Sequence, residues 1–211
     1  MNEKLRFDEN NLIERLDALS VSHRTVFAAS CSERLLPNYQ FFSSLARWGD
    51  YDFLRLTLDK IWLAPLSSDI NVRFDSVMKE KLNFLAPDTE DYDSFWASLA
   101  LDAVSCVFHA IECCQESDPK IAAVTGRIAY SSIYSYYLSV NDPNLNTSHS
   151  DEVLEEEALN SSLMQQELQK QASDLDVLQR ISSIGIDSIN QIRLTATNLG
   201  VNPSRRGFVV R

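Results

Sequence analysis

The chain has 211 residues, of which 45% are hydrophobic and 23% charged, the composition of an ordinary globular protein. Its 30 acidic residues outnumber its 19 Lys and Arg, which leaves a formal net charge of −11. Because this excess repels phosphates, neither nucleic acid nor an anionic membrane is an expected partner. We see no linker, so we expect one domain over residues 1–211, with a frayed N-terminus at 1–8 and a C-terminal tail at 203–211.

Glycine and proline are scarce, at 5 and 6 residues, which favours helices over turn-rich β folds. The spacing of apolar residues predicts a first helix over residues 11–19 and a second over about 20–35. Pro37 is then expected to break or kink the chain before a short helix over residues 38–45, which Asn38 would cap.

The next two helices are predicted from their caps and their apolar faces. Gly49 and Asp50 indicate the end of one helix and the cap of the next. On that next helix one face carries Leu54, Leu58, Ile61 and Trp62. After a loop, the apolar spacing over residues 74–85 predicts another amphipathic helix.

The most apolar helix is predicted over residues 95–114 and is expected at the centre of a bundle. Proline suits a first turn, so a helix over residues 119–138 follows. After a polar loop at 141–150, residues 151–199 keep steps of three, four or seven between apolar residues. This spacing is compatible with one continuous long helix, or with one that the Ser182-Ser183 pair and Gly185 bend or interrupt. These elements give an all-α fold: a single-domain bundle of about seven or eight helices.

The cysteines and the first residues predict a cytoplasmic protein. The N-terminal residues contain no apolar leader segment, and no CxxC spacing occurs among Cys31, Cys106, Cys113 and Cys114. Cys106, His109 and Cys113 fall on one face of the central helix, but one helix is a poor scaffold for zinc. We therefore expect core residues there, and neither a metal nor a cofactor.

Several short runs resemble those of a known family. The distinctive ones are the nine residues from Cys31 to Tyr39, the Gly49-Asp50 pair, and the five residues from Leu58 to Trp62. In these the chain is similar to the YjaG-like family, a bacterial domain of unknown function (DUF416). The resemblance implies an all-α fold and a bacterial cytosolic protein. It implies no activity, cofactor or catalytic residue.

Asp102 is the first candidate for a functional residue, because it lies deep inside an otherwise apolar predicted helix. A buried carboxylate must be paired, hydrogen-bonded or protonated. Arg34, Arg55 and Arg127 are its candidate partners. Asp102 is then either a general acid or base with a raised pKa, or one half of a structural ion pair.

A second candidate is a polar group near the predicted break at Pro37. Its members are Glu33, Arg34, Asn38, Tyr39, Asp50, Arg55 and Asp59. Arg55 and Asp59 are neighbours on one helix face, whereas Glu33 and Arg34 point about 100° apart. Arginine with two carboxylates could bind a small zwitterion or a phosphorylated metabolite. The alternative is a salt-bridge network between helices.

Two functions are compatible with these residues. The absence of any catalytic motif favours a non-enzymatic interaction or scaffold protein, whose partner is another protein or a second copy of the chain. A homodimer would use the Tyr130, Tyr134 and Tyr137 face or the 151–199 helix. The alternative is a small-molecule-binding protein or enzyme with an arginine and carboxylate pocket around Asp102.

Overall fold

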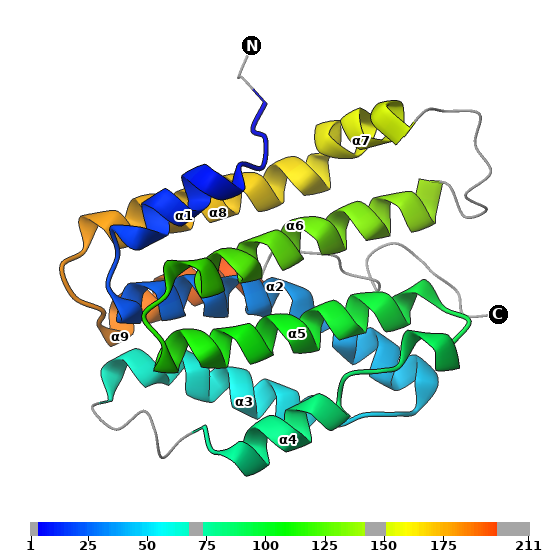
Figure 1. Ribbon diagram of the computed structural model, residues 1–211, viewed down its shortest axis with the longest axis horizontal. Coiled ribbons are helices and arrows are strands. Elements are labelled where there is room, and N and C mark those ends of the chain that lie inside the picture. Colours follow the sequence, from blue (N-terminus) through cyan, green and yellow to red (C-terminus); the bar gives the residue numbers. More distant parts are fainter. Residues whose placement is uncertain (1–3, 68–73, 142–150, 198–211) are drawn as a thin grey trace.

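The computed structural model describes residues 4–67, 74–141 and 151–197 (Figure 1). These ranges contain nine α-helices, two short 3₁₀ helices and no strand, so the predicted all-α class is confirmed, with one or two helices more than expected. The helices are α1 (Glu9–Asp17), α2 (Val21–Ala46), α3 (Tyr51–Leu63), η1 (Ala64–Leu66), α4 (Ser76–Phe84), η2 (Thr89–Asp91), α5 (Phe95–Gln115), α6 (Pro119–Asn141), α7 (Asp151–Asn160), α8 (Ser162–Arg180) and α9 (Ile186–Thr197).

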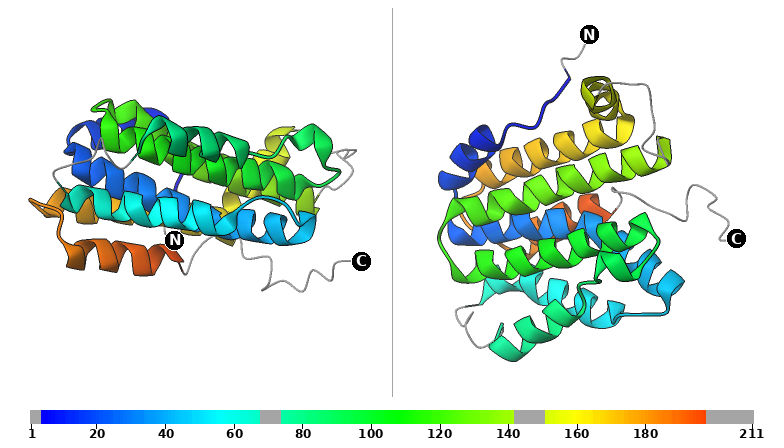
Figure 2. Two further views of the ribbon diagram at one scale, coloured as in Figure 1. Left: turned by 90° about the horizontal axis from the view of Figure 1, so that it is seen from below. Right: turned by 45° about the vertical axis from the view of Figure 1, so that its right-hand side comes forward.

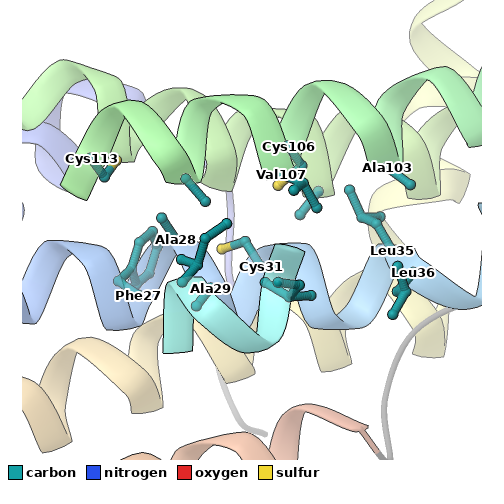
Figure 3. Packing of buried hydrophobic residues seen from close by; sticks show 14 of the residues in the cluster. Phe27, Ala28, Ala29, Cys31, Leu35, Leu36, Ala103, Cys106, Val107 and Cys113 are labelled. Atoms are coloured by element: carbon teal, nitrogen blue, oxygen red, sulfur yellow. The ribbon is translucent and has the colours of Figure 1, made fainter. Parts of the chain in front are cut away.

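The centre of the bundle is the packed pair α2 and α5. The two helices run antiparallel, so that Phe27 lies near Cys113 while Leu35 and Leu36 lie near Ala103 (Figure 3). Small alanine and cysteine side chains line much of this contact and allow a close approach of the backbones. The expectation of a central apolar helix is confirmed, and α2 shares that place.

The remaining helices surround this pair. α6, α8 and α1 lie on one side, and α3 and α4 lie on the other (Figures 1 and 2). α9 packs on α2 at the face opposite α5 (Figures 2 and 3). By length and composition α5 would pass for a membrane-spanning segment, but 61% of its most apolar stretch is buried inside this fold, as in the core helix of a globular domain.

The helices differ from the expected course at two places. α2 continues through Pro37 to Ala46, so the predicted break is wrong. Residues 25–39 are buried on almost every side, and this packing outweighs the one backbone hydrogen bond that proline removes. The long helix over residues 151–199 is instead three helices. Ser161 caps α8, accepting a hydrogen bond from Met164 N at 3.2 Å, and a second break precedes α9 at Gly185.

The N-terminal residues expected to fray include a well-packed segment. Residues 4–8 precede α1 and belong to no helix, and the backbone of Asp8 is extended. The exposure of these residues alternates along the segment, as it does in a strand lying on a surface. Leu5 and Phe7 pack against the core, while the residues on either side of each face solvent. The tail predicted at 203–211 lies outside the described residues.

Candidate functional site

The polar residues predicted to form one group divide among several places, and Glu33, Arg55 and Asp59 are the three that stay together. Glu33 and Arg34 are adjacent in α2 and point about 100° apart, so they face different helices. Arg34 points toward α8, and Glu33 points toward α3 and α9. Each is the centre of its own ionic network, which we call the inner network and the outer network.

The inner network is fully buried and joins α2 to α8. The Arg34 guanidinium donates to the Glu167 carboxylate through Nε at 2.6 Å and Nη2 at 2.5 Å, and it also donates to the Ser30 carbonyl at 2.8 Å. The Ser30 hydroxyl donates to Asp174 at 2.7 Å, and Lys170 completes the network by pairing with Asp174. Arg34 is 1% exposed, so these bonds replace all its contacts with water.

Burial and opposite charge act against each other on the two cations of the inner network. Burial by itself would lower the pKa of Arg34, but the carboxylate of Glu167 outweighs this effect and raises that pKa. Burial lowers the pKa of Lys170. Gln171 extends the network by donating to Glu167 at 2.8 Å and to the Gly126 carbonyl of α6 at 3.0 Å. Gly126 suits this place because a Cβ there would lie 2.9 Å from the Gln171 oxygen.

The outer network is half-buried and joins α2, α3 and α9. Glu33 accepts hydrogen bonds from Arg55 at 2.6 and 3.0 Å and from the Trp62 indole at 2.8 Å. Asp59 accepts from Arg55 at 2.8 Å and from Arg193 of α9, whose Nε lies 3.5 Å from Glu33. Burial lowers the pKa of Arg55, but the hydrogen bonds to Glu33 raise that pKa by more, so the net shift is upward.

Tyr39 and Asp50 belong to a turn rather than to either network. Asp50 caps α3, accepting from Phe53 N at 2.9 Å, and pairs with Lys81 at 3.0 Å. These two bonds lower the pKa of Asp50, the backbone one most. The buried Tyr39 hydroxyl accepts from Asp50 N at 3.3 Å. Gly49 lies between them at φ +89°, and a Cβ there would approach the Tyr39 oxygen to 2.3 Å.

Asn38 does not cap a helix, and the prediction that it would is wrong. Because α2 continues past Pro37, Asn38 lies in the helix interior and is fully buried. Neither its amide oxygen nor its amide nitrogen has a hydrogen-bond partner among the residues that the structure describes. An unpaired buried amide lowers the free energy of unfolding, so Asn38 destabilises the core.

Asp102 lies apart from all these residues, on the side of α5 that faces α6. Burial raises its pKa to about 6, and the nearby Ser132 hydroxyl opposes that shift. It makes no ion pair with any described residue, since Arg34 and Arg55 bind other carboxylates and Arg127 lies 3.4 Å from an acid of α1. The prediction of an arginine partner is therefore wrong, and the pocket that would gather these groups is not formed.

The thiols and the imidazole of the central helix do not gather around a metal site. Within the described ranges, no three His, Cys, Asp or Glu side chains are placed to hold an ion. Cys106 and Cys113 are buried, and burial raises the pKa of both thiols well above the ordinary value. His109 is half-buried and its Nδ1 lies 2.7 Å from Glu112. Both cysteines behave as small apolar core residues.

Comparison with known proteins places the chain among proteins of undescribed activity. A family model described as "Protein of unknown function (DUF416)" matches residues 11–202. An uncharacterized protein of Haemophilus influenzae is 34% identical over 107 residues, which are 48% of this chain and 54% of that protein, so the match spans about half of the relative. The resemblance found in the sequence is confirmed.

A solved structure shares the fold. It is the crystal structure of a DUF416 family protein from Shewanella baltica, with a TM-score of 0.75 and 23% sequence identity. The alignment covers 88% of this chain and 93% of the other. At this identity the likeness establishes the arrangement of the helices.

Proposed function

The chain belongs to the DUF416 family, which is described as a family of unknown function, and from this premise we propose that it is a non-enzymatic interaction protein of the cytoplasm. The supporting observation is that both ionic networks are balanced inside the chain. Each contains two cations and two carboxylates: Arg34, Lys170, Glu167 and Asp174 in the inner network, and Arg55, Arg193, Glu33 and Asp59 in the outer one.

A balanced network is a poor site for a substrate. Catalytic and ligand-binding sites keep a few polar groups available for the bound molecule. Here each carboxylate already accepts a hydrogen bond from a cation of the same network. The networks therefore act as connections between helices, and the outer surface is left to carry the function.

The surface has features that suit contact with another protein. Val77 and Phe84 lie seven positions apart on one face of α4 and are 70% and 72% exposed. Large apolar side chains grouped on one helix face are typical of contact surfaces. The four cysteines are free and buried, as in proteins of a reducing compartment. The partner is another protein or a second copy of this chain.

Native mass spectrometry of the full chain, purified from cells without added ligand, tests the proposal. We expect the mass of the bare chain, its integer multiples, or the chain with a second protein. A denaturing spectrum of the same sample is the control, because it separates covalent modification from bound molecules. A stoichiometric small molecule or metal that leaves on denaturation would overturn the proposal.

A further inference from the structure

Residues 4–8, which we call the strap, lie on the surface formed by α6, α7 and α8. The strap precedes α1 and runs toward α7 (Figure 2, right). Its stretched course from α1 toward α7 and its alternating exposure are the features of an extended peptide bound to a protein surface. The strap therefore shows what kind of chain this surface accepts.

The side chain of Gln165, in α8, binds the backbone of the strap. The Gln165 amide oxygen accepts from Leu5 N at 3.0 Å, and the Gln165 amide nitrogen donates to Leu5 O at 2.9 Å. The same nitrogen donates to the Leu159 carbonyl at 2.9 Å, which fixes the orientation of the amide. Because both bonds go to the main chain of Leu5, Gln165 can hold an extended segment of another sequence in the same way.

The side chains of the strap match the surface in charge and shape. Phe7 stacks on Tyr130 of α6, with the ring centroids 4.8 Å apart and the planes at 18°. Arg6 pairs with Glu156 of α7 at 2.9 Å, and Lys4 contacts Asn160. The surface thus accepts apolar side chains at alternate positions and basic ones between them.

The strap does not fill the surface it covers. A groove of about 180 Å³ remains between residues 5–15 on one side and α8 on the other, with Leu12, Leu168 and Leu175 among its apolar walls. Small-molecule pockets usually begin near 300 Å³, so this groove suits a single apolar side chain better than a metabolite. A segment with a larger apolar residue could use space that the strap leaves.

We propose that this surface is a docking site for an extended segment of a partner protein that alternates basic and apolar residues, and that the strap occupies it until the partner displaces it. The inference rests on the proposed function and deepens it by naming the partner class. The seated strap and the charge match with α7 carry it. In this arrangement the apparent affinity for the partner is the intrinsic affinity multiplied by the fraction of molecules in which the strap is unseated.

The test compares the full chain with a variant whose strap is weakened by Leu5→Ser and Phe7→Ser. The probe is a fluorescein-labelled synthetic peptide with the sequence of residues 4–9, Lys-Leu-Arg-Phe-Asp-Glu, followed by fluorescence anisotropy. We expect the variant to bind this peptide about tenfold more tightly than the unmodified chain. A peptide with Lys4 and Arg6 replaced by glutamate should not bind.

Two further changes locate the binding on the proposed surface. In the weakened-strap background, Gln165→Leu should abolish peptide binding, whereas Gln166→Leu, at the exposed next position, should leave it unchanged. If Gln165→Leu does not fold, as judged by circular dichroism, Glu156→Lys replaces it, because Glu156 is exposed and binds Arg6.

The possible results separate the explanations. No binding to the weakened-strap variant, or equal loss with both glutamine variants, would overturn the docking site. A dimer of the unmodified chain that the strap substitutions dissociate, seen by light scattering, would mean that two copies exchange straps, which also overturns the partner assignment. A small molecule found by native mass spectrometry would refute the proposed function but leave the peptide result standing.

Discussion

Replacing Arg34 with methionine tests whether the inner network holds α8 on α2. Methionine keeps much of the side-chain volume of arginine. It leaves the buried carboxylate of Glu167, a residue that is 3% exposed, without the two hydrogen bonds that Arg34 donates to it. Removing one member of a buried ion pair costs about 3–5 kcal/mol. With a urea m-value of about 2–3 kcal/mol/M, the unfolding midpoint should fall by about 1–2.5 M.

The double variant Arg34→Met with Glu167→Met separates the loss of the pair from the burial of a lone charge. It removes one positive and one negative charge and leaves the Lys170–Asp174 pair in place. Because apolar residues often replace a buried ion pair without loss, this variant should be more stable than Arg34→Met alone. Circular dichroism during urea unfolding measures both variants.

The matched control is Arg127→Met on the surface. Arg127 lies 3.4 Å from Glu9, and its side chain is 52% exposed, so its loss should change the free energy of unfolding by about 0.5 kcal/mol or less. The reasoning is refuted if Arg34→Met costs no more than this control. It is also refuted if the double variant is no more stable than Arg34→Met alone.

Three other substitutions follow from the same contacts. The pKa of Asp102 is raised from 3.8 to about 6, so the folded state binds the Asp102 proton more tightly than the unfolded state, and stability falls as the pH rises from about 4 to 6. Asp102→Asn should therefore stabilise the protein by about 1–2 kcal/mol at pH 8 and by nothing near pH 3. Urea unfolding at each pH measures the difference. Asn38→Leu removes an unpaired buried amide and should raise stability by about 1–2 kcal/mol; a loss in thermal unfolding would contradict this account. Gly49→Ala should destabilise by about 1–3 kcal/mol, because alanine is strained at φ +89° and its Cβ would meet Tyr39; an unchanged melting temperature would count against it.

Most of the fold could be predicted from local patterns. The helical class, the central place of α5 and the cap at Asp50 follow from apolar spacing, helix propensity and capping chemistry. The continuity of α2 through Pro37 could not be predicted in this way. Its cause is burial against helices far along the chain, and that burial outweighs the local cost of a proline.

The break within residues 151–199 was missed for a related reason. Apolar residues spaced for one helix are equally compatible with three helices that each pack on the same core. Ser161 supplies the side-chain cap that starts α8. A serine just before the apolar residues of a helical pattern is a start signal, and Ser161 stands in that position before Leu163 and Met164.

The candidate site was predicted in part. The geometry of adjacent helix positions correctly kept Glu33 and Arg34 from pairing with each other. Glu33 binds Arg55, which the sequence already placed in the same group, but Glu167, which binds Arg34, lies 133 positions away in α8. Arg193, which lies 3.5 Å from Glu33, comes from α9, and no local rule connects either helix to α2. One signal was present. Glu167, Lys170 and Asp174 recur at steps of three and four beside apolar Leu168 and Leu175, which places charges on the buried face of a helix.

The inner network and the proposed docking site meet on α8. Gln165 and Glu167 are two positions apart, about 200° around the helix, so one faces the strap while the other faces Arg34. A buried ionic network adds little net stability, but it fixes the rotation and register of the helix that carries it. By holding α8 in one register, Arg34 sets the position of the Gln165 amide at the surface. The charges that suggested a binding pocket in the sequence therefore serve the surface indirectly, by positioning the residue that binds the strap.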